Sequence, residues 1–246
     1  MTALITIYIP TKNRRLHLSK AIDSVLNQTY KNWELIIVND ASTDDTESFL
    51  TELTDKHHNI KCFHNTVSQG ACAARNTAIQ NAKGLFVTGL DDDDLFTPNR
   101  LQVLVDNYDD KYSFISTSWV MSPNTIKDRL REFLRYKSGD IDLNSMLDLN
   151  HIGNQVYVRR DRILSLGGFD ENLQSWQDYD MWIRLIERFG PSLKLKTPTQ
   201  IILNDESMLR ITTSPKRIDG IKYFIEKHRS KMTNKQVKRV LKQLSL

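Results

Sequence analysis

Four adjacent aspartates, Asp91 to Asp94, directly follow the apolar segment at residues 85–90. Such a segment predicts a buried strand, and adjacent carboxylates repel one another strongly. Carboxylates at the end of a core strand need a positive partner, which can be a divalent cation or a group of Arg and Lys side chains. Without such a partner they must lie in water. The run alone therefore predicts either a cation site or a solvated acidic turn.

The composition is that of one large globular domain or two small ones. The chain has 246 residues, of which 39% are hydrophobic and 26% are charged, so it can bury a real core. No apolar run approaches the length of a membrane span, and no basic region precedes the first apolar residues as in a secretory signal. Cys62 and Cys72, the only cysteines, have no metal-binding spacing. We therefore expect a cytoplasmic, reducing environment.

Strand and helix patterns alternate over the first 120 residues. Short β-rich runs predict strands at residues 4–9, 33–38, 60–63, 85–90 and 112–120, and helical periodicity or helix-capping residues fill the intervals. The first strand is expected to stop at Pro10. Alternation with short turns predicts an α/β fold with a parallel, doubly wound sheet.

Polar clusters follow three of these strands at their carboxyl ends. They are residues 10–13, the pair Asn39-Asp40, and the four aspartates. Because doubly wound sheets bind ligands at the carboxyl ends of their strands, this convergence favours a binding site over a solvated turn.

Two phosphate-binding motifs are missing from the sequence. No Gly-x-Gly-x-x-Gly follows the first strand, and no Gly-Lys-Ser or Gly-Lys-Thr loop occurs. A bound diphosphate would therefore need a metal to neutralise it. Aspartate oxygens are hard ligands suited to Mg²⁺ or Mn²⁺.

The second half of the chain gives weaker patterns. Residues 121–150 fit no clear element, residues 155–158 predict a short strand, and a helix with a buried face is expected to begin near Asp178 and end at Gly190. Asp178 can cap this helix, or it can act as a general base whose ionised form the helix start favours. The two roles are compatible.

The C-terminal residues are strongly basic. From Lys216 onward, ten lysines and arginines stand against Asp219 and Glu226, a net charge of +8, so the remainder of the +4 chain is at −4. A helical apolar stripe predicts either a solvated charged face over a packed stripe or contact with an anionic membrane surface. No nucleic-acid motif is present, so we expect no nucleic-acid partner.

Six segments together resemble the family 2 glycosyltransferases, which are inverting nucleotide-sugar enzymes with a GT-A fold. The segments keep the family's order and spacing over about residues 4–190, and they are residues 9–14, 24–30, 34–44, 70–76, 91–94 and 177–180. Residues 152–156 and 211–216 resemble the bacterial enzymes for capsule, O-antigen and exopolysaccharide, in particular the colanic acid type.

The resemblance implies the architecture. It is a Rossmann-like, mostly parallel central sheet flanked by helices, in a single domain over residues 1–215. Residues 1–120 would form the nucleotide-binding half and residues 121–215 the acceptor-binding half, followed by a basic helical extension over residues 216–246.

The resemblance also implies the donor site. The residues that would contact the nucleotide-sugar are Pro10, Thr11, Asn13, Asp40, Arg75, Asp91 and Asp92. Thr11 and Asp40 would contact the uracil of a UDP-sugar, and Arg75 the base or ribose. Asp91 and Asp93 match the ends of the family's Asp-x-Asp motif. Asp93 is the expected ligand of Mn²⁺ or Mg²⁺, although Asp91, Asp92 and Asp94 are also possible because every position is Asp.

Asp178 takes the place of the family's catalytic base. The Glu that precedes this base in the family is Gln177 here. The family often has a His near the diphosphate, but residues 204–208 contain none, so Arg210 or Lys216 could supply a positive charge instead.

The function implied by the resemblance is transfer of a hexosyl or N-acetylhexosaminyl group from a UDP-sugar to a saccharide acceptor in surface polysaccharide synthesis. An oligosaccharide or lipid-linked acceptor would bring the protein to the inner face of the cell membrane, where the basic extension could contact lipid. Two alternatives stay open. A nucleotidyltransferase also holds a metal and a nucleotide, but it typically carries a glycine-rich loop that is missing here. A non-catalytic nucleotide-sugar-binding subunit would bind UDP without turnover.

Overall fold

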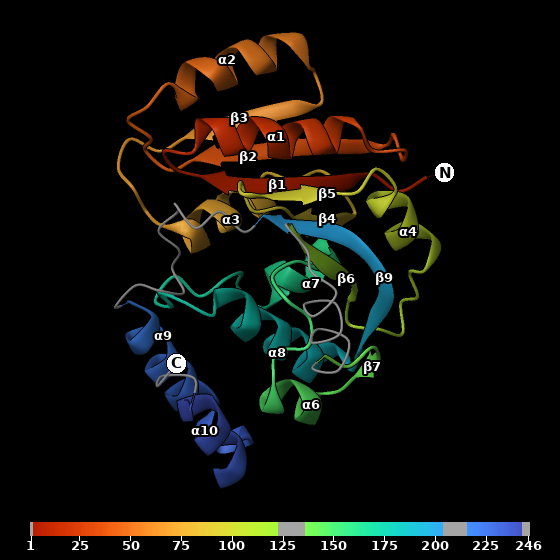
Figure 1. Ribbon diagram of the computed structural model, residues 1–246, viewed down its shortest axis with the longest axis vertical. Helices are drawn as coiled ribbons and strands as arrows, with labels where there is room; N and C mark the ends of the chain where they lie inside the picture. The colour runs from red at the N-terminus through yellow and green to blue at the C-terminus, as the bar shows by residue number, and fades with distance from the viewer. Residues whose placement is uncertain (1, 123–135, 204–215, 243–246) are drawn as a thin grey trace.

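The structure is a computed structural model that describes residues 2–122, 136–203 and 216–242 (Figure 1). The strands of the described residues form one sheet, in the order β3-β2-β1-β4-β8-β6-β9-β5, and β7 pairs with β9 beside this path. The strands are β1 (Ile5–Thr11), β2 (Trp33–Asn39), β3 (Ile60–His64), β4 (Phe86–Gly89), β5 (Asp94–Phe96), β6 (Ile115–Ser122), β7 (Gly139–Ile141), β8 (Tyr157–Arg159) and β9 (Ser192–Leu203).

The first four strands are parallel, as the sequence predicts. β1 lies between β2 and β4, and β3 pairs with the outer edge of β2. All seven residues of β2 are buried, because helices cover both faces of a parallel sheet. The other half is mixed, since β8 runs antiparallel to both β4 and β6, and β9 is parallel to β6 but antiparallel to β5 and β7. The predicted α/β class with a central sheet between helices is confirmed.

Two details of the strands differ from the prediction. β1 runs through Pro10 to Thr11, because its pairing with β4 has already ended at Tyr8 and only β2 flanks it at Pro10. β5 was not predicted, and it begins at Asp94 itself, which pairs with Ile202 of β9. The last aspartate of the acidic run is therefore part of the sheet.

Two sets of helices cover the two faces of the sheet (Figure 1). The first face carries α1 (Arg15–Leu26), α2 (Thr46–Lys56) and α4 (Arg100–Asp106). The second face carries α3 (Ala71–Gln80), α6 (Leu143–Asp148), α7 (Arg160–Ser165) and α8 (Gln177–Phe189). α9 (Lys216–His228) and α10 (Asn234–Leu241) lie beyond α8 and α6, away from the sheet (Figure 1). None of the helices in the described residues is long and apolar enough to cross a membrane.

The basic C-terminal helices pack onto the rest of the protein. Ile221 and Phe224 of α9 and Val240 of α10 are buried in the same apolar cluster as Tyr179 and Trp182 of α8. The packed apolar stripe is therefore confirmed. Part of the positive charge is also paired internally, through the ion pairs Lys227–Asp170, Lys231–Glu187 and Arg239–Asp148.

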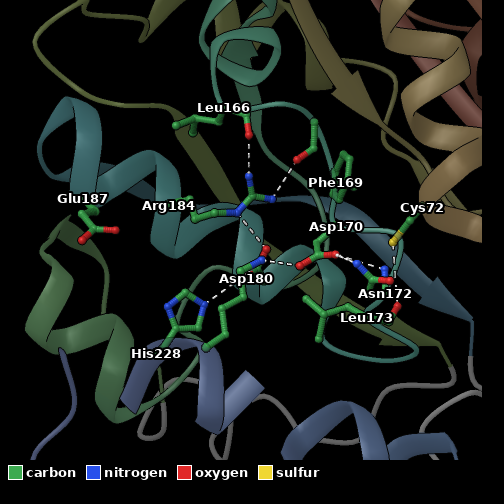
Figure 2. A network of polar contacts seen from close by, with 12 residues as sticks. Cys72, Leu166, Phe169, Asp170, Asn172, Leu173, Asp180, Arg184, Glu187 and His228 are labelled. Atoms are coloured by element: carbon green, nitrogen blue, oxygen red, sulfur yellow. Dashed lines mark hydrogen bonds and ion pairs between the residues drawn. The ribbon is translucent and has the colours of Figure 1, made fainter. Parts of the chain in front are cut away.

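A buried carboxylate joins α9 to α8. Figure 2 shows Asp180 of α8, which has no solvent exposure, between side chains of both helices. Its Oδ2 accepts a hydrogen bond from Nε of Arg184 at 2.8 Å, and its Oδ1 lies 2.8 Å from Nε2 of His228 and 2.9 Å from Nζ of Lys227. Burial raises the pKa of Asp180, but the hydrogen bond from His228 and the charges of Arg184 and Lys227 outweigh burial and bring this pKa to about 2.

We predict that Asp180→Asn lowers the free energy of unfolding by about 3–5 kcal/mol at pH 7, because it removes the charge of a fully buried carboxylate that pairs with Arg184 and Lys227. Urea denaturation measures this loss. Glu187→Gln is the matched control on α8, because Glu187 is an exposed partner of Lys231 and the change should cost about 1 kcal/mol or less.

The same prediction has a pH dependence. Since the folded-state pKa of Asp180 is depressed, its stabilisation is present above about pH 4 and is lost as the pH falls toward 2. The difference between the wild type and Asp180→Asn should shrink over that window. A difference no larger than that of Glu187→Gln at pH 7 would contradict the role of this cluster.

Candidate functional site

The carboxyl ends of β1, β2 and β4 open onto one pocket of about 610 Å³, called here the donor pocket. Its lining residues are Pro10, Thr11, Lys12, Arg14, Asp40, Ser68, Gly70, Ala71, Ala74, Arg75, Asp91, Asp92, Asp93, Asp94, Asn154 and Ile202. The three polar clusters that the sequence singles out therefore meet in space. Asn13 and Asn39 are the exceptions, because both lie outside this lining. Oδ1 of Asn13 accepts a hydrogen bond from the N–H of Thr43 at 2.7 Å.

Asp91 is held from two directions. Its Oδ1 accepts hydrogen bonds from Nη2 of Arg75 at 3.0 Å and from Nε2 of Gln155 at 3.1 Å. Its Oδ2 accepts a bond from Nδ2 of Asn154 at 2.8 Å. The first aspartate is thus the meeting point of α3 and the segment that precedes β8.

Asp92 and Asp93 share one arginine. Nη1 of Arg14 donates to Oδ1 of Asp92 at 3.1 Å and to Oδ2 of Asp93 at 2.8 Å. The second oxygen of Asp92 accepts a bond from Oγ1 of Thr11 at 2.8 Å. Burial raises the pKa of Asp92 to about 6, although the charge of Arg14 and the hydrogen bond from Thr11 oppose that rise.

Asp94 faces the opposite side of the run. Its Oδ2 accepts hydrogen bonds from Nε2 of Gln200 at 2.8 Å and from Nδ2 of Asn154 at 3.0 Å. The side chain is buried, and burial together with the charges of Asp91 and Asp93 raises its pKa. Asp94 is therefore hydrogen-bonded to β9, and its surroundings disfavour its ionised form.

The donor set fits a divalent cation held by one carboxylate. Within the described residues, no three His, Cys, Asp or Glu side chains come together in a way that could hold a metal. Mg²⁺ sites at nucleotides typically use one or two carboxylates and take their other ligands from phosphates and water. Both oxygens of Asp91 and Asp92 accept side-chain hydrogen bonds, whereas the described bond of Asp93 uses Oδ2 alone. Asp93 is thus the aspartate best able to take a cation.

Asp40 is saturated by its own surroundings. Its Oδ1 accepts bonds from Nδ2 of Asn65 and the N–H of Gln69, and its Oδ2 accepts bonds from Oγ of Ser68 and the N–H of Gly70, all at 2.7–2.9 Å. Burial raises the pKa of Asp40, but these hydrogen bonds outweigh it and lower the pKa below its ordinary value. Asp40 therefore fixes the loop that leads into α3.

A second pocket, called here the acceptor pocket, adjoins the donor pocket. It has a volume of about 350 Å³, and the two share the side chains of Arg75, Asp91 and Asn154. Four of its other lining residues are aromatic, namely Trp119, Tyr136, Trp176 and Tyr179. Such surfaces suit ligands with one apolar face and polar edges.

Asp178 lines the acceptor pocket from the first turn of α8. Burial raises its pKa to about 6, while the charge of Arg75 and the N–H groups of the first turn oppose that rise. Trp176 occupies the N-cap position with φ of 63°, and no side chain caps the helix. Asp178 therefore does not act as the N-cap, and the pocket holds a carboxylate poised to titrate near neutral pH.

Several site residues were missed by the sequence prediction. Arg14, Asn154 and Gln155 lie in segments already singled out by the family resemblance, so those motifs could have drawn attention to them. Gln200 lies in a strand and carried no signal. Residues 204–208 and Arg210 lie outside the described residues, and so does the side chain of Lys216.

Comparisons with known proteins agree on one family. The family model described as glycosyl transferase family 2 matches residues 6–160. A curated relative from Escherichia coli K12, the putative colanic acid biosynthesis glycosyl transferase WcaA, is 36% identical over 232 residues, which cover 93% of this chain and 82% of WcaA. The Escherichia coli protein named UDP-Glc:alpha-D-GlcNAc-diphosphoundecaprenol beta-1,3-glucosyltransferase WfgD is 32% identical over 186 residues, covering 75% of this chain and 70% of WfgD.

Solved structures share the fold at low sequence identity. The crystal structure of S. aureus TarS 1-349 in complex with UDP-GlcNAc aligns with a TM-score of 0.75 at 15% identity, covering 97% of this chain and 72% of the TarS chain. The mannosyltransferase PcManGT from Pyrobaculum calidifontis, in complex with GDP-Man and Mn²⁺, aligns with a TM-score of 0.70 at 21% identity, covering 97% of this chain and 68% of its own. These likenesses establish the fold, which is that of GT-A glycosyltransferases.

We predict that Asp40→Asn lowers the free energy of unfolding by about 1–3 kcal/mol, because an amide nitrogen would face backbone donors that then lose their acceptor. Thermal or urea unfolding measures this change. Asp45→Asn is the control, since Asp45 lies in the same turn with its side chain 70% exposed and should change stability by less than about 0.5 kcal/mol. Equal effects of the two changes would show that the four hydrogen bonds of Asp40 do not stabilise the loop.

Proposed function

Because this chain belongs to glycosyl transferase family 2, we propose that it transfers a sugar from a UDP-sugar to a hydroxyl group of a saccharide acceptor, with inversion at the anomeric carbon. The observation that carries this proposal is the meeting of the two pockets at Arg75, Asp91 and Asn154. Acidic residues line the donor side of this junction, and Asp178 lines the acceptor side. Family membership sets aside the nucleotidyltransferase alternative.

The nucleotide of the donor lies in the donor pocket. Thr11 and Asp40 contact the uracil, and Pro10 lines this end of the pocket, whereas Asn13 lies outside the lining. Arg75 contacts the base or ribose, and Asp91 and Asp92 face the ribose or sugar. A base N–H reaches Asp40 only by replacing one of its four donors. Nη1 of Arg75 is buried without a hydrogen-bond partner among the described residues, so a ligand oxygen would satisfy it. The TarS complex with UDP-GlcNAc supports a UDP-sugar donor.

Asp93 would hold Mn²⁺ or Mg²⁺ against the diphosphate. A divalent cation there would neutralise the phosphates and stabilise the charge on the departing UDP. The Mn²⁺ in the PcManGT complex supports this requirement. Arg14 forms ion pairs with both Asp92 and Asp93. Its positive charge partly offsets the negative charge of the acidic run when no cation is bound.

Asp178 acts as the general base. As the acceptor oxygen forms its bond to the anomeric carbon, Asp178 takes the hydroxyl proton, and the bond from that carbon to the β-phosphate oxygen breaks. A carboxylate with a pKa of about 6 is a stronger base than an ordinary aspartate and is still ionised at pH 7. The acceptor sugar lies against the aromatic walls of its pocket, where Trp119 and Trp176 offer flat apolar surfaces.

The acceptor belongs to bacterial surface polysaccharide synthesis. The names of WcaA and WfgD refer to colanic acid biosynthesis and to a sugar on a diphosphoundecaprenol carrier, which supports an acceptor linked to a lipid diphosphate. Such an acceptor would bring the protein to the cytoplasmic face of the membrane. The exposed lysines of α9 and α10, Lys222, Lys235 and Lys238, remain able to contact anionic lipid there.

We predict that Asp178→Asn cuts turnover by at least about 100-fold, because the general base is lost, and leaves UDP affinity within about twofold. Release of UDP from a panel of UDP-sugars, with and without saccharide acceptors, measures turnover, and calorimetry measures affinity. Glu187→Gln on the same helix is the control and should retain turnover.

The wild-type rate should rise with pH through about 6, because Asp178 must be ionised to accept the proton. Near-normal turnover of Asp178→Asn would remove Asp178 from this role. UDP binding by a wild type that turns over no UDP-sugar would instead favour the non-catalytic binding subunit.

We predict that Asp93→Asn abolishes most of the gain in UDP affinity that Mn²⁺ gives, because an amide oxygen is a much weaker ligand than a carboxylate. Calorimetry with UDP, in Mn²⁺ and in EDTA, measures that gain. Asp45→Asn removes an exposed carboxylate outside the pocket and should leave the gain intact. If Asp91→Asn, and not Asp93→Asn, removes the gain, the ligand is the first aspartate of the run.

A further inference from the structure

A third pocket, called here the cationic pocket, lies outside the site described above. It has a volume of about 380 Å³ and is lined by Lys137, Asp148, Leu149, His151 and Arg239. It shares no lining residue with the donor pocket, so the sugar donor does not explain it.

The cationic pocket backs directly onto the acceptor pocket. Leu149 lines both of them. Adjacent residues of the chain line different pockets here. Tyr136 and Asn150 line the acceptor pocket, and the residues that follow them, Lys137 and His151, line the cationic pocket. Consecutive Cα atoms are about 4 Å apart. The two pockets are therefore direct neighbours that share the wall formed by Leu149.

The cationic pocket offers three kinds of donor. Nζ of Lys137 donates to Oγ of Ser145 at 3.0 Å, and no carboxylate is among its described partners. Arg239 pairs with Asp148 through Nη1 at 2.7 Å, which leaves other N–H groups of its five-donor fork available. The guanidinium is about half exposed, so these groups are accessible.

His151 adds a neutral donor. Its Nδ1 accepts the backbone N–H of Lys137 at 3.2 Å, which places the ring proton on Nε2. Burial, together with the charges of Lys137 and Lys194, lowers the pKa of His151 to about 4, so the ring is neutral at pH 7. Nζ of Lys194 donates to the carbonyl of His151 at 2.6 Å and adds positive potential from behind the pocket.

We propose that the cationic pocket binds the phosphate groups of an acceptor whose sugar occupies the acceptor pocket, so that Lys137, His151 and Arg239 select a sugar linked to a diphosphate. This inference rests on the proposed function for its assignment of the acceptor pocket. Lysine and arginine form charge-assisted hydrogen bonds to phosphate oxygens, and the reacting hydroxyl and the phosphate would lie at opposite ends of one sugar.

A lipid headgroup is the other source of phosphate chemistry, but the pocket suits it less well. Sites for anionic membranes typically present four to eight lysines and arginines on an exposed surface. The cationic pocket is concave, has two formal cations in its lining, and includes Asp148.

The first experiment measures binding of inorganic pyrophosphate in EDTA by calorimetry, which needs no turnover. We expect the double variant Lys137→Ala/Arg239→Ala to bind pyrophosphate at least about tenfold more weakly than the wild type, since each lost charge-assisted bond contributes about that factor. The matched control is Lys222→Ala/Lys238→Ala, which removes two exposed lysines of α9 and α10 outside the pocket and should stay within twofold. Equal losses in both variants, or displacement of pyrophosphate by UDP in the wild type, would overturn the proposal.

The second experiment separates the two sources of phosphate. It compares an alkyl N-acetylglucosamine diphosphate with the matching alkyl N-acetylglucosaminide, and it tests flotation with phosphatidylglycerol vesicles. We expect the wild type to prefer the diphosphate probe at least about tenfold, the Lys137→Ala/Arg239→Ala variant to lose that preference, and this variant to bind vesicles as the wild type does. A variant that keeps the preference but loses vesicle binding would assign these residues to the membrane and overturn the proposal.

The proposed function and this inference can fail separately. If the wild type turns over no UDP-sugar, the proposed function fails, while the pyrophosphate titration still tests the cationic pocket. If turnover is found but the two double variants bind pyrophosphate alike, only the inference fails. Equal urea midpoints of the two double variants would establish that a loss of binding does not reflect unfolding.

Discussion

The mutual repulsion of four adjacent aspartates is the constraint on which the crevice depends. No single counter-ion can serve them all, so each carboxylate is held by a different part of the chain. Arg75 of α3 holds Asp91, Thr11 of β1 holds Asp92, and Gln200 of β9 holds Asp94, while Arg14 bridges Asp92 and Asp93. Asp94 also begins β5, which pairs with β9. The acidic run thus joins the parallel half of the sheet to the mixed half, and Asp93 has the fewest described hydrogen bonds of the four.

Local patterns predicted the parallel half of the fold because its strands are buried on both faces and therefore appear as continuous apolar runs. The other half was predicted only in part, for a physical reason. The predicted strands at residues 112–120 and 155–158 overlap β6 and β8. β5 and β7 were missed because they have three residues each, too few for periodicity, and they are strands only because a distant segment pairs with them. In β9, alternating lysines hide a long strand whose Lys194 is nonetheless buried. Pairing partners far apart in sequence decide these elements.

The donor pocket was predictable for a related reason. Parallel strands bring their carboxyl ends to one edge, so polar residues at three strand ends could be expected to meet, and they do. The partners that orient them could not be predicted, because Asn154 and Gln200 acquire their role only through tertiary contact with Asp94. The sequence could not decide whether Asp178 caps its helix or lines a pocket, because that depends on what surrounds its side chain in the folded protein. The contact of Asp40 with uracil stays a prediction, and the saturated carboxylate gives it a second role in holding its loop.

Two carboxylates of α8, two residues apart, show how one helix serves both chemistry and anchoring. Successive residues of a helix turn by about 100°, so Asp178 and Asp180 project from nearly opposite sides. Burial with little compensation raises the pKa of Asp178, whereas His228, Arg184 and Lys227 lower that of Asp180. A carboxylate whose pKa is raised can accept a proton near neutral pH, whereas one whose pKa is lowered stays charged. The permanent charge fixes α8 to α9, and α10 then places Arg239 at the cationic pocket beside the acceptor pocket. If Asp178 is the base, as proposed, the basic C-terminal helices would influence the reaction by holding α8, which carries Asp178, and by completing the wall of the cationic pocket.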